Sequence, residues 1–170
     1  MSEKKKSLNE FYELKVKDLM ETITSEIPCI EDKTNVAIVF SILHNKDHVW
    51  VVDSKEHKHL LGVITESDTI VLFSPPYASL QSFDKPDSRS LQYGVTLTAE
   101  EIMSKKPVVT SPDEKIRDVF MKMKEQKIKQ LPVVDENNKL VGEITLHHLI
   151  IRYHDEHNNT FSSEKDDKNS

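Results

Sequence analysis

The chain has 170 residues, 36% of them apolar and 31% charged, and its formal net charge is −6 at pH 7. Its three glycines lie far apart, which excludes the clustered glycine loops with which Walker-type nucleoside triphosphatases, protein kinases and Rossmann dinucleotide enzymes hold phosphate. Its single cysteine excludes an intrachain disulfide and a cysteine-based zinc ribbon.

The first predicted element is a helix over residues 1–15. Ser7 and Glu10 have the spacing of a capping box, in which each side chain bonds to the other residue's backbone N–H. Leu8, Phe11 and Tyr12 fall on one face of this helix.

Residues 16–73 show a helical pattern followed by strand patterns. The helical spacing is carried by Val36, Val39, Phe40 and Leu43. A strand, a turn, a returning strand and a final helix are then expected at 49–52, 53–59, 60–64 and 66–73.

Residues 74–96 are predicted to be a linker, because the stretch 74–90 is rich in Ser, Pro and Asp. At its end apolar and polar residues alternate, which predicts a strand. The apolar positions of that strand are Leu91, Tyr93, Val95 and Leu97.

Residues 97–154 repeat the order of the earlier elements. Thr98 and Glu101 form a capping box for a short helix, and Ser111 and Glu114 form another, with Pro112 at the first helical position. An amphipathic helix, two strands and a last helix follow, with apolar residues at 116–123, 131–134, 140–144 and 146–153. The polar tail, 155–170, is expected to be disordered.

An internal repeat links the two halves. Gly62 and Gly142 are 80 residues apart, and each is followed three residues later by a threonine. The same shift pairs Val36 with Ile116, Val39 with Val119 and Phe40 with Phe120. The chain is therefore a duplicated β-α-β-β-α unit. One unit of about 60 residues buries only a marginal core, so the two are expected to pair.

These two copies resemble the tandem cystathionine-β-synthase (CBS) domain pair, or Bateman module, and we expect a stand-alone pair. The stretches that carry the resemblance are 49–53 with 61–68 and 131–135 with 141–148. The resemblance implies an α/β (α+β) fold in which repeats 16–73 and 97–154 pack as a pseudo-twofold pair. It also implies a regulatory, non-catalytic function.

In this family the clefts between repeats bind adenosine-containing ligands, namely AMP, ADP, ATP or S-adenosylmethionine. The resemblance assigns ribose binding to Asp68 and a phosphate contact to Thr65, and it makes Lys129 a second phosphate contact. A carboxylate can accept bonds from two vicinal hydroxyls, and a threonine at a helix start lies where an anion is favoured. The adenine would lie against Ile27, Pro28, Cys29 and Ile30.

The second repeat departs from this pattern, since Thr145 is present but His148 replaces the ribose-binding aspartate. A neutral imidazole accepts one hydrogen bond and a protonated one accepts none. We therefore expect one nucleotide site, at Asp68, and a degenerate second site.

Other interpretations remain open. Thr65 and Asp68 also have the spacing of a helix cap, so the chain could be an interaction scaffold with vestigial clefts. The acidic balance makes nucleic acid an unexpected partner, although several lysines crowd one helix.

No catalytic group, catalytic cofactor or metal site is expected, and Cys29 is interpreted as a small buried hydrophobe. No apolar stretch approaches the roughly 20 residues of a membrane span. We expect a cytoplasmic homodimer that signals to an unidentified partner protein.

Overall fold

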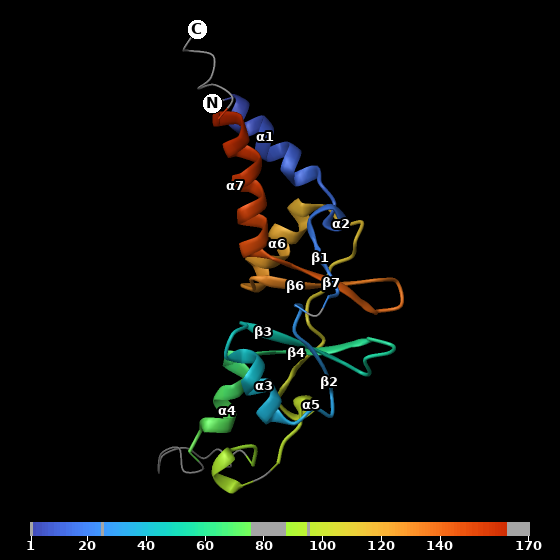
Figure 1. Ribbon diagram of the computed structural model, residues 1–170, viewed down its shortest axis with the longest axis vertical. Helices are drawn as coiled ribbons and strands as arrows, with labels where there is room; N and C mark the ends of the chain where they lie inside the picture. Colours follow the sequence, from blue (N-terminus) through green and yellow to red (C-terminus); the bar gives the residue numbers. More distant parts are fainter. Residues whose placement is uncertain (1, 25, 76–87, 95, 163–170) are drawn as a thin grey trace. The chain divides into compact units, whose positions relative to one another are not determined.

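The computed structural model describes residues 2–24, 26–75, 88–94 and 96–162, which form two compact units (Figure 1). Unit 1 comprises Met1–Ile23, Val108–Glu136 and Val141–Ser170, and unit 2 comprises Thr24–Pro107 and Asn137–Leu140. Most of the predicted linker 74–96 lies outside the described residues. Both units combine helices with a small sheet, so the predicted mixed α/β fold is confirmed.

Unit 1 is built on a three-stranded sheet of order β1-β7-β6, in which β1 is antiparallel to β7. In Figure 1 its three long helices lie on one side of the β6–β7 ribbon. Its elements are α1 (Ser2–Glu13), α2 (Val16–Leu19), β1 (Glu21–Thr22), α6 (Ile116–Gln126), β6 (Gln130–Val134), β7 (Leu140–Thr145) and α7 (Leu146–Ser162).

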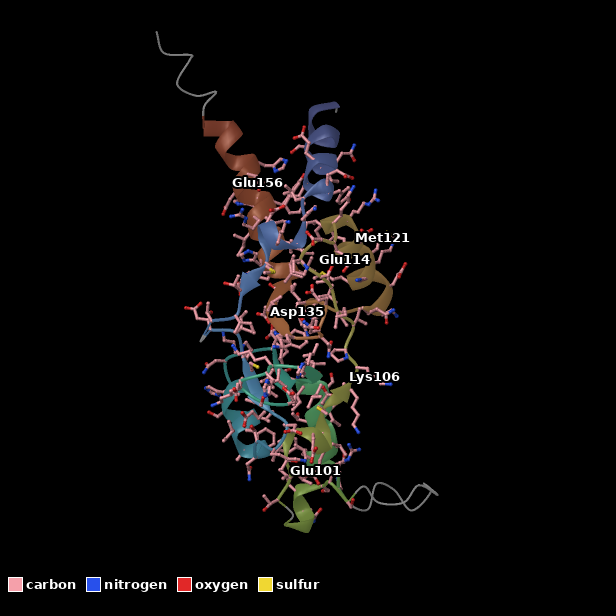
Figure 2. All side chains as sticks on the ribbon, turned by 90° about the vertical axis from the view of Figure 1, so that its right-hand side faces the viewer. Glu101, Lys106, Glu114, Met121, Asp135 and Glu156 are labelled. Atoms are coloured by element: carbon pink, nitrogen blue, oxygen red, sulfur yellow. The ribbon has the colours of Figure 1, made fainter. Side chains whose placement is uncertain are left out.

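The core of unit 1 explains why α6 forms. Ile116, Val119 and Met123 recur at helical spacing and are all buried, while Met121 is 56% exposed on the same helix (Figure 2). The helix ends where Lys127 adopts a left-handed conformation, with φ of 54°. The other core residues come from the N-terminal segment, the sheet and α7: Phe11, Val16, Leu19, Leu131, Val133, Ile144 and Leu149.

The C-terminal helix is longer than predicted. Disorder was expected from Asp155 onward, but α7 continues to Ser162. Helix α1 stabilises this extension. The Tyr153 ring packs edge-on against the Phe11 ring, with 5.3 Å between the ring centroids, and His157 is hydrogen-bonded to Ser7. A polar segment can stay helical where a neighbouring helix supplies its apolar and hydrogen-bonding partners. Residues 163–170 lie outside the described residues.

Unit 2 is built on a four-stranded sheet of order β2-β3-β4-β5, with β2 parallel to β3 and the other pairs antiparallel. Its core contains buried apolar residues such as Val39, Val49, Val51 and Ile64. Its elements are β2 (Cys29–Glu31), α3 (Val36–Leu43), β3 (His48–Val52), β4 (Leu60–Thr65), η1 (Glu66–Thr69), α4 (Ile70–Phe73), η2 (Leu91–Tyr93), α5 (Ala99–Ile102) and β5 (Ser104–Lys105).

Two further local predictions are wrong. The alternation at 91–97 gives a 3₁₀ helix, η2, instead of a strand, because the Ser90 hydroxyl caps the Gln92 N–H and Gly94 ends the turn at φ 67°. The Ser111–Glu114 box gives a turn, and α6 begins only at Ile116. Glu114 accepts the Ser111 N–H at 3.0 Å, as in a capping box, and also bonds to Lys122 of α6.

The two repeat glycines allow a short strand to approach each sheet. A Cβ atom on Gly142 would lie 2.2 Å from the Glu21 carbonyl oxygen of β1. A Cβ atom on Gly62 would lie 2.6 Å from Met103 Sδ and 2.7 Å from the Ser104 carbonyl oxygen of β5. Both positions therefore require glycine for close backbone approach.

Candidate functional site

Thr65 and Asp68 lie together where β4 ends and η1 begins. The Thr65 N–H donates to Asp68 Oδ2 at 2.8 Å, and the Thr65 hydroxyl donates to the same oxygen at 3.1 Å. This arrangement is a capping box. Since η1 and α4 have four residues each, few peptide dipoles align behind Thr65. The helix itself thus adds little to the anion binding expected there.

The other oxygen of Asp68 is engaged by a residue far away in sequence. The Ser104 hydroxyl donates to Asp68 Oδ1 at 2.7 Å. Ser104 opens β5 and lies opposite Val63 of β4, so the sheet brings it to the end of β4. Sequence spacing gave no signal for this contact, because 36 residues separate the two side chains.

The corresponding place in unit 1 has different chemistry. The Thr145 hydroxyl accepts the His148 N–H at 3.1 Å, and His148 Nδ1 lies 3.3 Å from Glu21 Oε1. Glu21 lies opposite Glu143 of β7 and so occupies the place that Ser104 has in unit 2. Unit 1 therefore pairs the His148 imidazole with the Glu21 carboxylate. At the same place, unit 2 pairs the Asp68 carboxylate with the Ser104 hydroxyl.

The residues expected to line an adenine lie on and before β2. Ile27 and Ile30 are buried, and Ile30 belongs to the core of unit 2. The Pro28 carbonyl accepts the Trp50 N–H at 2.9 Å, so β3 orders this segment. Burial raises the pKa of the Cys29 thiol to about 11, which keeps it protonated and fits a small apolar residue better than a nucleophile.

The predicted phosphate contact, Lys129, lies in unit 1 between α6 and β6. Its side chain is exposed, and its carbonyl accepts the Leu146 N–H at 2.7 Å. Thr65, Asp68 and the segment 27–30 all belong to unit 2. The contribution of Lys129 to their site stays a prediction.

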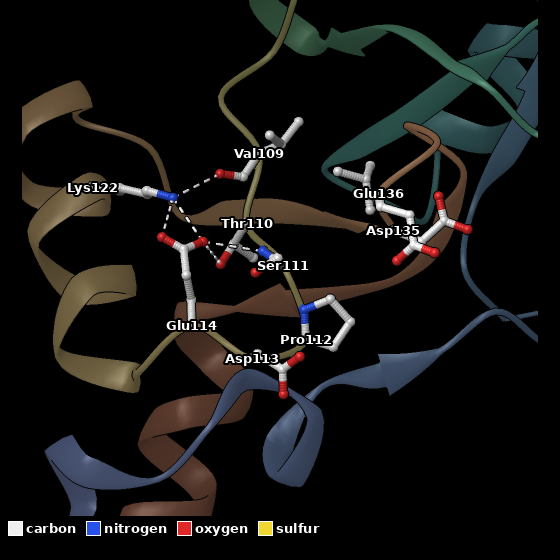
Figure 3. Close-up of a pocket in the computed structure, with 10 residues that line it drawn as sticks. Val109, Thr110, Ser111, Pro112, Asp113, Glu114, Lys122, Asp135 and Glu136 are labelled. Carbon is white, nitrogen blue, oxygen red and sulfur yellow. Dashed lines mark hydrogen bonds and ion pairs between the residues drawn. The ribbon is translucent and has the colours of Figure 1, made fainter.

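A half-buried polar cluster in unit 1 was not predicted (Figure 3). Lys122 Nζ donates to the two oxygens of Glu114 at 2.6 and 2.8 Å and to the Val109 carbonyl at 2.9 Å. The Thr110 hydroxyl donates to the same carboxylate at 2.5 Å. Burial alone raises the pKa of Glu114, but the bonds from Lys122, Thr110 and the Ser111 N–H outweigh it and lower the pKa.

The cluster borders an open cavity of about 430 Å³ whose opposite rim carries Asp135 and Glu136 (Figure 3). Lys122 is one of the lysines that crowd α6, and its charge is matched by Glu114. This pairing weakens the nucleic-acid interpretation, which needs lysines available to phosphate.

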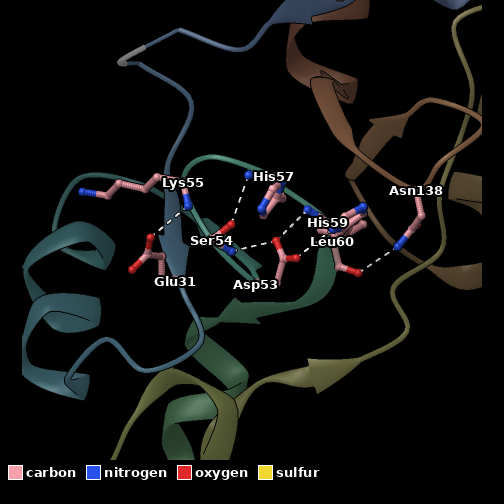
Figure 4. Close-up of polar contacts among 8 residues, drawn as sticks. All are labelled: Glu31, Asp53, Ser54, Lys55, His57, His59, Leu60 and Asn138. Carbon is pink, nitrogen blue, oxygen red and sulfur yellow. Dashed lines mark hydrogen bonds and ion pairs between the residues drawn. The ribbon is translucent and has the colours of Figure 1, made fainter.

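The turn between β3 and β4 is a second polar cluster (Figure 4). Asp53 Oδ1 accepts the N–H groups of Ser54 and His59 at 2.7 and 2.9 Å, and Oδ2 lies 2.7 Å from His59 Nδ1. The bond to the His59 side chain is the main reason why the pKa of Asp53 is lowered. Asn138 Nδ2 donates to the Leu60 carbonyl at 3.0 Å.

Within the described ranges, no three His, Cys, Asp or Glu side chains gather closely enough to hold a metal ion. Across the same ranges, the helices are too short or too polar to cross a membrane.

The model of the CBS domain family matches residues 16–73 and again residues 99–155, together more than half of the chain. Among curated proteins, a homoserine O-acetyltransferase of Methanosphaera stadtmanae is 29% identical over 135 residues, which are 79% of this chain and 23% of that enzyme. An uncharacterized protein of Methanocaldococcus jannaschii is 28% identical over 153 residues, which are 79% of this chain and 88% of that protein.

A third relative, an L-aspartate semialdehyde sulfurtransferase of Methanocaldococcus jannaschii, is 30% identical over 131 residues, 75% of this chain and 21% of that enzyme. The chain thus spans less than a quarter of the length of each of these two enzymes.

Two of the solved structures that share the fold were determined with adenosine compounds. A CBS domain pair in complex with 5′-methylthioadenosine and S-adenosyl-L-methionine is 25% identical, with a TM-score of 0.61 over 84% of this chain and 98% of that chain. A protein solved with AMP is 21% identical, with a TM-score of 0.64 over 81% of this chain and 94% of that chain, and at that identity the likeness concerns the fold alone.

Proposed function

Because the chain belongs to the CBS domain family, we propose that it is a non-catalytic regulatory module that binds an adenosine-containing ligand at Thr65 and Asp68. The observation that carries this proposal is the Asp68 carboxylate, held by Thr65 at the end of β4 with both oxygens oriented by hydrogen bonds. Ribose hydroxyls are donors that such a carboxylate can accept. AMP, ADP, ATP and S-adenosylmethionine are the candidate ligands.

The asymmetry between the units supports a single ribose site. Asp68 is a hydrogen-bond acceptor, whereas His148 stands at the matching place next to Glu21. The related CBS pair that is 25% identical was solved with two adenosine compounds, which makes this ligand class the first to test.

Regulation would follow from differential binding. A ligand that binds one arrangement of the chain more tightly shifts the population toward that arrangement, and a partner protein reads the shift. The partner, the cytoplasmic location and the contact of Lys129 with a phosphate belong to this proposal.

Homodimer formation is also part of the proposal. Helices α3 and α4 expose Ile38, Ile70 and Phe73, at 52%, 65% and 67%. Ile70→Asp should shift sedimentation toward the monomer if this face is the dimer contact, and an unchanged sedimentation coefficient would argue against it.

A thermal-shift screen tests the ligand proposal. At a ligand concentration about 100 times Kd, one of the four compounds should raise the melting temperature by about 5 °C or more. Asp68→Ala should abolish the shift, and His148→Ala should leave it intact. If no compound stabilises the wild-type chain, or if Asp68→Ala responds as the wild type does, the proposed site is wrong.

The scaffold interpretation has one observation in its favour: Asp68 already has structural partners in Thr65 and Ser104, so its presence needs no ligand. Under that interpretation Asp68→Ala lowers the stability of the chain, and none of the four compounds changes it.

A further inference from the structure

The hydrogen bonds of Asp68 leave too few acceptor positions for a ribose. An ionised carboxylate accepts about four hydrogen bonds. Three are already taken: the Thr65 N–H and hydroxyl donate to Oδ2, and the Ser104 hydroxyl donates to Oδ1. A vicinal diol donates two, so one of the three present donors has to leave when a ribose binds.

We propose that Ser104 is the residue that leaves, and that its hydroxyl gates the Asp68 carboxylate. This inference rests on the proposed function. The Thr65 N–H and hydroxyl both donate to Oδ2 within the capping box that begins η1. Ser104, in contrast, lies on an exposed two-residue strand, and it alone engages Oδ1 among the bonds above. One ribose hydroxyl takes the place of Ser104 and the other takes the remaining acceptor position, and the charge of Asp68 stays unchanged.

The same contact position recurs in unit 1, which shows that it belongs to the fold. Ser104 lies opposite Val63 of β4. Glu21 lies opposite Glu143 of β7, which is the residue 80 positions after Val63 and so its equivalent in the second repeat. Each reaches the side chain that lies three residues after the repeat threonine. In unit 1 the contact joins the His148 imidazole to the Glu21 carboxylate. Unit 1 therefore has no equivalent of the Asp68 carboxylate with a serine hydroxyl that a ribose hydroxyl could replace.

The exchange gives the ligand a structural effect. Ser104 follows α5, whose Ala99 and Ile102 are buried in the core of unit 2. Strand β5 is held to β4 by the pairs Gly62–Lys105 and Val63–Ser104. Loss of the Ser104–Asp68 bond removes the side-chain anchor of β5, the last strand before the chain enters unit 1 at Val108. Ligand binding should therefore loosen β5.

Calorimetric titration of Ser104 variants with AMP, ADP, ATP and S-adenosylmethionine tests this gate. Ser104→Ala removes the competing donor and should tighten the best ligand by about three- to tenfold. Ser104→Thr keeps the hydroxyl and should retain the wild-type affinity. Ser104→Lys places a cation beside Asp68 and should weaken binding at least tenfold. Ser67→Ala, on the exposed side of η1, is the matched control and should bind as the wild type does.

Hydrogen exchange of the full chain supplies a second measurement: the Lys105 amide should exchange faster when the ligand is bound. The gate is overturned if Ser104→Ala binds as the wild type does or more weakly, or if exchange at β5 slows on binding. If the wild-type chain binds none of the four compounds, the proposed function itself fails. That result is distinct from ligand binding that is insensitive to Ser104.

Discussion

At the scale of single residues, the two repeat glycines have a role that is set by backbone contact. Gly142→Ala places a Cβ atom against the Glu21 carbonyl, so β1 has to move. We expect the free energy of unfolding to fall by about 1–3 kcal/mol, the usual cost of overpacking. Denaturant titration measures this loss.

Gly94 provides the matched control for that experiment. A Cβ atom there has no heavy atom within 4 Å, and φ is 67°. Gly94→Asn should change stability little, because asparagine tolerates this conformation. If Gly142→Ala proves as stable as the wild type, the close approach of β1 is not a constraint.

The Glu114–Lys122 pair makes a pH prediction. Because the pKa of Glu114 is lowered on folding, its contribution to stability is present above the ordinary glutamate pKa and is lost as the pH falls through the lowered value. Removal of Lys122 should raise the pKa of Glu114 and weaken this acid dependence. Denaturant midpoints of Lys122→Met, Glu114→Gln and the double variant, measured from pH 7 to pH 3, test this. A coupling energy near zero would contradict it, since direct contacts usually couple by about 0.5–3 kcal/mol.

At the scale of elements, the turn between β3 and β4 is paired with the segment 137–140. The Leu60 N–H donates to the Asn138 carbonyl at 3.1 Å, and the Leu140 N–H donates to the Lys58 carbonyl at 2.9 Å. Lys58 and Asn138, 80 residues apart, both have positive φ, at 57° and 60°. The two repeats therefore share the same backbone conformation at this position, although their side chains differ.

This turn should be sensitive to acid through Asp53. The bond to His59 lowers the pKa of Asp53, so the stabilisation is present above the ordinary aspartate pKa and disappears as the pH falls through the lowered value. His59→Ala should remove it, and Asp53→Asn should make stability independent of this titration. Amide exchange at Leu60 and Leu140 between pH 3 and pH 7 reports on the pairing. Equal acid dependence in His59→Ala and the wild type would refute the role of His59.

The longer helices and strands could be predicted from the sequence, and the shortest elements could not. The periodic apolar residues of α3 and α6 and the apolar runs of β3 and β4 carry enough positions to establish a pattern. Strands β1 and β5 have two residues each and carry no period. The same limit applies to the site. Thr65 and Asp68 are local neighbours that spacing could pair, whereas Ser104 reaches Asp68 only through the register of β4 and β5.

At the scale of the whole molecule, the compact units differ from the repeats seen in the sequence. Helix α2 and strand β1 open the first repeat but belong to unit 1, and α5 and β5 open the second repeat but belong to unit 2. Each sheet is completed by a strand from the opposite half of the sequence.

Deletion of residues 1–23 should therefore unfold unit 1, although the second repeat is untouched. The deletion removes Phe11, Val16 and Leu19 from the core, and each buried side chain of this size contributes about 1.5–3 kcal/mol. Hydrogen exchange should show protection lost in α6 and α7 and kept in β3. Protection retained in α6 would show that the second repeat folds without the N-terminal segment.

Because each sheet contains a strand from the other half of the chain, the gene cannot be cut between the two repeats without damage to both units. Neither half of the coding sequence specifies a finished fold, because each half lacks the strand and short helix that the other half supplies. A recombination event that transfers one repeat alone leaves an open sheet edge and an uncovered core. The smallest piece that can be moved into a new protein intact is thus the whole pair.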